Sequence, residues 1–429
     1  MWKSLQKSEV GGRILLILLL GFFLINGWNR RNQKSDFLDY YHASERWKAG
    51  ENLYKFDVAY ELKDKVKSWE ELFLPENAKL LSDLQTQTAT YIYPPLFAYL
   101  LLPLTYFPAP VASGIHQVIG FLCLLGILYL FWKGEFFGRN FKNREWILSL
   151  VLLLNFRFLE SHVQNNQVGL LLVLLVLLAL IAKNDGFAGI LLALATSIKV
   201  TPLVFLAIFV YQKRWKAILW FVFGIFVWNA LPASTHLAYT QDMTWQWWKE
   251  VLGNALTNPL LRSWKNNQSL PSTLAKYFIS GADFVNQPLY RMPFLDLEMK
   301  TVQKIQAFIL LLSGIPILFL MRQKNREWEL TSLLFLASAI FSGISWVHSF
   351  VVCLFPIYFL LTEQALWGKE TKGKKILLGI CLIPLLSHRS VVGSTLESVL
   401  LMVSILLYYS FALYTYIIWK NIRADETRH

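Results

Sequence analysis

Charged side chains are scarce in this chain, and their scarcity is the first constraint on its class. Lys, Arg, Asp and Glu supply 16% of the 429 residues, whereas a soluble globular domain carries about a quarter. Hydrophobic residues supply 55%, and the mean hydropathy is +0.41. Many apolar stretches follow one another with short polar breaks, and a bilayer span needs roughly 20 apolar residues. The composition therefore excludes a soluble multi-domain protein and predicts an integral membrane protein.

Cysteine is also scarce, and the usual signatures of soluble enzymes are missing. Cys123, Cys353 and Cys381 all lie inside apolar stretches, so no disulfide framework is expected in the polar loops. The chain has no GxxxxGKS phosphate loop, no HExxH motif, no paired CxxC motif and no evident DxD metal site. We therefore expect neither a metal ion nor a cofactor.

The net charge of +13 is distributed as in a membrane protein. Most of the excess Lys and Arg lies in short loops between apolar stretches, which is the positive-inside pattern and argues against a nucleic-acid partner. The first apolar stretch, 12–28, ends at Trp28 and is followed by Asn29-Arg30-Arg31, with no small-residue cleavage site. We interpret it as an uncleaved anchor rather than a signal peptide. Both termini are predicted to be cytoplasmic.

The spacing of the apolar stretches predicts an all-α polytopic protein of about 12 transmembrane helices, with residues 1–429 forming one membrane domain. Two long extracytoplasmic loops are expected, at 29–110 with interfacial helices and at 234–301. The stretch 94–108 is short and bracketed by prolines, so we expect an interfacial helix there. The stretch 187–211 contains Lys199 and Pro202 and is predicted to form two short helices. The number of spans around 94–110 and 187–211 stays open.

This threading places polar groups from distant segments on the outer side, where they would share one amphiphilic cavity. The groups are Asp36, Tyr93, the bend 165–167, Lys199, the segment 267–269 and His348. Asp36 and Tyr40 are four residues apart, so they share a face if their segment is helical.

Each candidate has a structural alternative. Asp36 precedes an apolar run and is either an N-cap or a general base at the membrane surface, with Asp39 as its local competitor. Lys199 either extends to the interface or binds phosphate as a point charge. His348 follows a helix predicted over 330–346, where it either favours the helix C-terminus or donates a hydrogen bond to phosphate. The amide-rich segments 165–167 and 267–269 suit sugar hydroxyls, but they also suit ordinary turns, and the match of 267–269 to a glycosylation sequon is a weak signal.

At these residues the chain resembles glycosyltransferase family 87. The resemblance extends over about residues 36–356, and it departs from the family at Thr201 and at Ser349, which replaces a second histidine. These departures bear on the identity of the donor more than on the fold. The motifs that carry the resemblance are Asp36 with Tyr40, Gly50 and Tyr54; Tyr93-Pro94-Pro95; Asn166-Gln167; Ile198-Lys199-Val200-Thr201-Pro202 with Arg214-Trp215; Asn267-Gln268-Ser269; and Ser345-Trp346-Val347-His348.

The resemblance implies a GT-C fold in a bacterial inner membrane, with the active site on the periplasmic side. It implies a polyprenyl-phosphate-sugar donor as co-substrate, with mannose the expected sugar and a glycolipid, polysaccharide or protein as acceptor. Asp36 would be the catalytic base, and Lys199 and His348 would bind the donor phosphate. The implied substrate-binding residues are Tyr40, Tyr93, Asn166, Gln167, Asn267, Gln268 and Ser269.

The expected reaction is direct transfer with inversion at the anomeric carbon, because Asp36 would activate the attacking hydroxyl itself. Two alternatives remain. A flippase or permease for a lipid-linked sugar would use the same cavity, although transporters often have related halves and none is evident here. A glycan ligase or polymerase would need a diphosphate donor.

Overall fold

The computed structural model describes residues 9–33, 35–54, 75–77, 91–134, 136, 143–253, 265–279, 295–362 and 372–426, and every regular element within these ranges is a helix. The predicted all-α class is confirmed. Four helices are long and apolar enough to cross a bilayer: α2 (Glu9–Arg30), α8 (Ala109–Lys133), α14 (Trp215–Ala233) and α18 (Met299–Met321).

Other apolar segments are broken or short. The pair α9 (Arg144–Leu154) and α10 (Phe156–Asn165) bends by 63°, and the pair α21 (Lys372–Leu386) and α22 (Arg389–Met402) bends by 84°. If each pair is one span, the described residues hold up to six by length and composition. Helices such as α11 (Gly169–Ile181), with 13 residues, reach only about 20 Å. The predicted number of about twelve spans is therefore not confirmed.

Two predicted interruptions are present in the structure. The stretch 94–108 contains α7 (Pro95–Leu100) and a 3-10 helix, Leu102–Tyr106, in place of a full span. The stretch 187–211 breaks at Lys199, which separates α12 (Asp185–Ile198) from a 3-10 helix, Thr201–Phe205, that continues into α13 (Leu206–Tyr211). Proline near the start of each new segment has no N–H to donate, which suits a helix start and not a helix interior.

Both predicted outer loops contain helices, although parts of them lie outside the described residues. The first loop holds α3 (Phe37–Ala49), and the second holds α15 (Leu237–Gln246), the π-helical segment Trp247–Gly253 and α17 (Leu270–Phe278). Residues 55–74, 78–90, 254–264 and 280–294 are not among those described. The loop boundaries 29–110 and 234–301 remain predictions.

One predicted helix end is wrong, and the difference repositions a candidate residue. Helix α19 (Glu327–Ile340) ends six residues before Trp346, and His348 instead lies in the first turn of the 3-10 helix Val347–Cys353, which leads into α20 (Leu354–Thr362). Ser345 explains part of the early end, because its hydroxyl donates to the Ala339 carbonyl at 2.6 Å, a side-chain bond that competes with continued helix.

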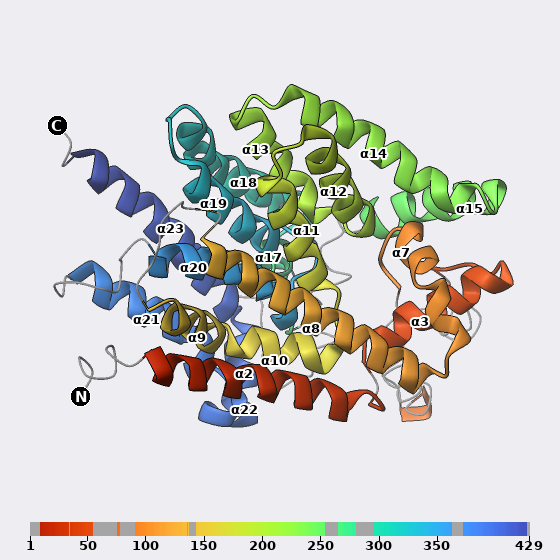
Figure 1. Ribbon diagram of the computed structural model, residues 1–429, viewed down its shortest axis with the longest axis horizontal. Coiled ribbons are helices and arrows are strands. Elements are labelled where there is room, and N and C mark those ends of the chain that lie inside the picture. The colour runs from red at the N-terminus through yellow and green to blue at the C-terminus, as the bar shows by residue number, and fades with distance from the viewer. Residues whose placement is uncertain are drawn as a thin grey trace.

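The helices pack with the two ends of the molecule clearly separated (Figure 1). Helix α2 begins, and α23 (Ile405–Glu426) ends, at the left of that view, whereas α3 and α7 lie at the right. Helix α12 packs closely along α14. A Cβ on Gly189 would lie 2.4 Å from the Ala217 carbonyl oxygen, and one on Gly224 would lie 2.7 Å from the Ala193 Cβ. Both glycines permit a close helix contact of the kind that small residues make in membranes.

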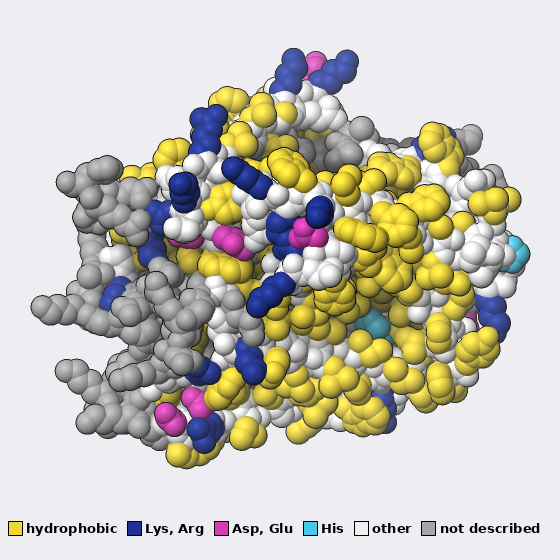
Figure 2. Space-filling view, turned by 45° about the horizontal axis from the view of Figure 1, so that its top comes forward, with side chains coloured by type: hydrophobic (Ala, Val, Ile, Leu, Met, Phe, Trp, Pro, Cys, Tyr) yellow, Lys and Arg dark blue, Asp and Glu magenta, His cyan; other side chains and the backbone are white. Residues whose placement is uncertain are grey.

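The outside of the molecule is apolar over wide areas. Figure 2 shows a broad area of hydrophobic side chains, with Lys and Arg gathered toward the upper and left parts of the view. Side chains on the long helices are open to the surroundings, with Leu18 64%, Phe226 70% and Leu311 71% exposed. Exposed apolar area of this extent is unfavourable in water but favourable against lipid, which supports a multi-pass membrane protein.

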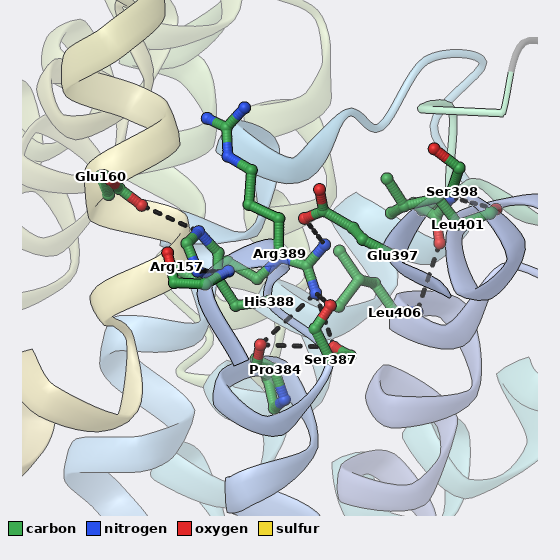
Figure 3. A network of polar contacts seen from close by, with 12 residues as sticks. Arg157, Glu160, Pro384, Ser387, His388, Arg389, Glu397, Ser398, Leu401 and Leu406 are labelled. Carbon is green, nitrogen blue, oxygen red and sulfur yellow. Dashed lines mark hydrogen bonds and ion pairs between the residues drawn. The ribbon is translucent and has the colours of Figure 1, made fainter. Parts of the chain in front are cut away.

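A buried arginine ties α10 to the bend between α21 and α22 (Figure 3). Arg157 is 2% exposed, donates to the Ser387 carbonyl oxygen at 2.8 Å, and forms an ion pair with Glu397 at 2.8 Å. Beside it, His388 contacts Glu160 of α10 at 3.0 Å. A buried charge is tolerated only when it is paired and hydrogen-bonded. This network therefore holds α10, which leads into the polar bend at its C-terminal end.

Candidate active site

Asp36 lies directly before α3, but its carboxylate does not cap that helix. The side chain makes no capping hydrogen bond to the first turn. It instead accepts a short hydrogen bond from the side-chain amide of Gln167, which lies in the bend after α10. The N-cap interpretation is therefore not supported, because the acceptor atom that capping needs is directed at a residue 131 positions away.

Gln167 is held in place by the residue before it. Asn166 has φ +48°, a left-handed conformation that asparagine tolerates better than most residues. Its amide donates to the Ser113 carbonyl at 3.0 Å, and its oxygen lies 2.7 Å from the His116 Nδ1. Asn166 is 2% exposed and bonded at both ends, so it fixes the bend; its predicted contact with substrate stays a prediction.

Two tyrosines determine how the Gln167 amide is oriented. The hydroxyl of Tyr40 donates to the Gln167 oxygen at 2.8 Å, and that of Tyr93 donates at 3.3 Å. The two hydroxyls also lie 3.1 Å apart. A phenol needs an acceptor and an ionised carboxylate needs a donor, so only one amide orientation serves both, with nitrogen toward Asp36. Tyr40 and Tyr93 therefore act on Asp36 through Gln167.

The Asp36 carboxyl is set for proton transfer near neutral pH. Burial raises the pKa of Asp36 to about 6, and the hydrogen bond from Gln167 opposes that rise. Desolvation disfavours the charged form, whereas a donor favours it. A carboxyl with such a pKa is ionised at pH 7 and still basic enough to accept a proton.

Lys199 lies close to this group, in the break between α12 and the next helix. Its Nζ is 5.7 Å from the centre of the Tyr93 ring. Within the described part of the chain, this ammonium has no hydrogen bond or ion pair with another residue, and burial lowers the pKa of Lys199 to about 8. A cation with unused donors in a partly buried place favours an anionic ligand.

His348 shares a pocket with Lys199. That pocket is also lined by Tyr93 and Gln167, by serines of the segment 338–349, and by apolar residues of α11 and α19. The His348 ring packs against Trp346 at 5.8 Å between centroids and makes no hydrogen bond to a described residue. Because His348 lies at the start of a 3-10 helix, the alternative role at a helix C-terminus is excluded.

Asp36 itself is not among the pocket-lining residues. Gln167 lies between the carboxylate and the pocket, since it lines the pocket and bonds Asp36. The Gln167 amide is thus a shared neighbour of the predicted base, Asp36, and of the pocket that contains Lys199 and His348.

The second amide-rich segment lies elsewhere in the contact network. Asn267 donates to the Gly343 carbonyl at 3.0 Å and accepts from the Ser345 N–H at 2.9 Å. Gln268 donates to the Leu401 carbonyl at 2.7 Å. Ser269 caps α17 by accepting from the Ser272 N–H. These three residues join α17, the segment after α19 and the break between α22 and α23; their predicted contact with substrate stays a prediction.

Three polar residues near the site, Ser113, His116 and His162, were not predicted from the sequence to have a role. Ser113 and His116 anchor Asn166, and the His162 Nε2 accepts the Leu170 N–H at 3.1 Å, which satisfies the start of α11. The signal that could have identified them is a polar residue or histidine in an otherwise apolar span, where such groups are unfavourable without a partner.

Comparison with known proteins identifies the family of this chain. A model of glycosyltransferase family 87 matches residues 91–349, which is more than half of the chain and includes Tyr93, Gln167, Lys199 and His348 but not Asp36. A polyprenol-phosphate-mannose-dependent alpha-(1-2)-phosphatidylinositol pentamannoside mannosyltransferase of Mycolicibacterium smegmatis is 30% identical over 128 residues, which are 30% of this chain and 31% of that protein. The match thus spans about a third of that relative's length. The chain belongs to glycosyltransferase family 87.

Proposed function

We propose that this protein transfers a hexose, with mannose the expected sugar, from a polyprenyl-phosphate donor to a hydroxyl of a membrane glycolipid. The observation that carries the proposal is the Gln167 amide, which bonds the Asp36 carboxylate on one side and lines the pocket of Lys199 and His348 on the other. The mycobacterial relative uses a polyprenol-phosphate-mannose donor, which supports the same donor class here.

The reaction proceeds in one displacement. Asp36 accepts the proton of the acceptor hydroxyl as its oxygen bonds the anomeric carbon. The bond between that carbon and the phosphate oxygen breaks, and the phosphate leaves with the electron pair. Lys199 and His348 stabilise the charge that develops on the phosphate, which is the largest contribution such a site can make. Direct attack inverts the anomeric configuration of the sugar.

The two substrates place the site at the membrane boundary. A polyprenyl chain is as apolar as the helices around the pocket, so the donor tail can remain in the bilayer while its phosphate reaches Lys199. We assign the site to the periplasmic side of a bacterial inner membrane, because the basic loops predict the opposite side to be cytoplasmic. The proposed transfer uses protein groups alone and needs no metal ion.

The test is transfer by the purified protein. Radiolabelled polyprenyl-phosphate-mannose and a mannosylated glycolipid should give a new glycoside whose anomeric configuration is inverted relative to the donor. Asp36→Asn should lower the rate by about 10²–10⁴-fold, whereas Asp39→Asn, in the first turn of α3, should retain it. Movement of the donor across proteoliposomes without any glycoside would favour a flippase and contradict the proposal.

A further inference from the structure

A second apolar recess is also lined by Gln167. It lies between α2 and α8 and is closed at the back by α10 and the start of α11; we call it the α2–α8 groove. Its walls include Leu24 and Trp28 of α2 and Val118 and Phe121 of α8. Leu24, Trp28 and Val118 are 42%, 50% and 39% exposed. Because both helices are candidate spans, the groove opens toward lipid.

One end of the groove, beside Gly27 and Trp28, is polar. Gln117, His162, Asn166 and Gln167 line it, and Gln117 donates to the Val163 carbonyl at 2.7 Å. In the described structure the lining contains no Lys, Arg, Asp or Glu. Gln167 lines both this groove and the pocket of Lys199 and His348. An occupant of the groove therefore ends beside the group that bonds Asp36.

Two glycines keep the groove open. A Cβ on Gly120 would meet nothing within 4 Å, so a larger side chain there would extend into the groove. A Cβ on Gly27 would lie 3.0 Å from the Gln117 side-chain oxygen and 3.3 Å from Val163. The empty space thus depends on the missing side chains at these two positions.

The chemistry of the two recesses separates the two substrates. The donor must place its phosphate at Lys199 and His348, and that pocket continues along apolar side chains such as Leu172 and Val176 of α11, which suit the donor's own chain. The α2–α8 groove has no Lys, Arg, Asp or Glu in its described lining, and its polar end lies beside Arg31, whose guanidinium stacks on Trp28 at 4.5 Å. An alkyl chain in the groove with an anionic head group above it matches this order.

We propose that the α2–α8 groove binds the alkyl chain of a lipid-anchored acceptor and so presents the acceptor hydroxyl to Asp36. The inference rests on the proposed function for the identity of the reaction, but it concerns a separate site. The acceptor would then be a membrane lipid that carries a sugar. Gln167 would lie between the acceptor in the α2–α8 groove and the donor in the pocket of Lys199 and His348.

Filling the groove tests the inference in the full-length protein. Gly120→Leu should raise the KM for a long-chain alkyl mannoside by about tenfold or more, because each methylene expelled from an apolar site costs roughly fourfold in affinity. The KM for polyprenyl-phosphate-mannose and the rate with methyl mannoside, which has no chain to seat, should not change. Leu24→Trp fills the groove from the opposite wall and should act in the same way.

Gly314→Leu is the matched control. It adds the same side chain to another apolar span, α18, at a position where a Cβ also meets nothing within 4 Å, and it should alter none of the constants. A rise in the donor KM alone in Gly120→Leu would assign the groove to the donor chain and overturn the inference, as would unchanged acceptor kinetics in both groove variants.

A second measurement separates this inference from the proposed function. An alkyl mannoside with a diazirine at the end of its chain should crosslink to peptides of α2 and α8 in the wild-type protein and not in Gly120→Leu. Crosslinking without sugar transfer would contradict the proposed function and leave the groove as a lipid site. Sugar transfer without crosslinking to α2 or α8 would overturn the groove inference but would agree with the proposed function.

Discussion

Replacing Gln167 by glutamate tests how Asp36 is held and tuned. The substitution keeps the size of the side chain but exchanges the donor that faces Asp36 for a carboxylate oxygen. Two carboxylates at hydrogen-bonding distance cannot both remain ionised at neutral pH. The hydroxyls of Tyr40 and Tyr93 still donate to the introduced group and favour its ionised form. The shared proton should therefore reside on Asp36, where it blocks the base.

The size of the effect follows from the contact. Two charges about 4 Å apart at an effective dielectric constant of about 20 repel by about 4 kcal/mol, and about 1.4 kcal/mol corresponds to one pKa unit. Because Asp36 is partly exposed, we take a rise of about 2 units, from about 6 to about 8. The ionised fraction at pH 7 then falls from about nine-tenths to about one-tenth, so kcat/KM should fall about tenfold from ionisation alone.

The assay is kcat/KM against pH, which reports groups of the free enzyme. In the wild type, the rate should rise through about pH 6, as Asp36 loses its proton, and fall above about pH 8, as Lys199 loses its proton. In Gln167→Glu, the rising limb should move upward into the falling limb, which lowers the maximum. Asn165→Asp adds a carboxylate to the same bend, at a side chain that bonds Ser161 and not Gln167 or Asp36 among the described residues, and should leave the profile in place. An unmoved rising limb in Gln167→Glu would refute the coupling between Gln167 and Asp36.

Three further substitutions test the remaining contacts. Lys199→Gln should remove the fall in rate above about pH 8 and lower kcat/KM about 10- to 100-fold, the range for a hydrogen bond to a charged group. Lys216→Gln in α14 should do neither. An unchanged fall in rate above pH 8 in Lys199→Gln would remove Lys199 from the site. Asn267→Ala should lower the melting temperature, because the Ser345 N–H and the Gly343 carbonyl lose their partner at a cost of about 1–3 kcal/mol; equal melting temperatures would mean that the segment repacks. Arg157→Leu leaves Glu397 without its cation and should lower the free energy of unfolding by about 3 kcal/mol. This is the low end for a buried pair, since Glu397 keeps 18% side-chain exposure. A melting temperature no lower than that of the wild type would contradict the structural role of this network.

Local features were readable from the sequence because they depend on neighbouring residues. Apolar runs predict helices, and Pro202 beside Lys199 predicts a break, which lies where α12 ends. The order of short motifs sufficed to identify the family, since the family match covers residues 91–349 of the stretch that carries the resemblance. The predicted roles of Asp36, Lys199 and His348 remain to be tested by the substitutions above.

Other expectations depended on contacts that no local pattern reports. Asp36 matched an N-cap by position, yet its carboxylate bonds Gln167 instead. The predicted helix over 330–346 ends at Ile340, so His348 begins the next element instead of closing the previous one. The amides of Asn267 and Gln268 bond backbone groups of two other segments, 343–345 and the end of α22, and their expected contact with substrate stays a prediction.

The sequence by itself determined that the chain is helical, suited to lipid and equipped with a carboxylate, a lysine and a histidine in a known order, because composition and spacing act locally. Only the tertiary structure decided that Gln167 lies between Asp36 and the pocket of Lys199 and His348, and that the α2–α8 groove is lined by the same amide. These relations depend on the left-handed bend at Asn166 and on helices that pack across more than a hundred residues of sequence, and such packing is a property of the folded chain as a whole.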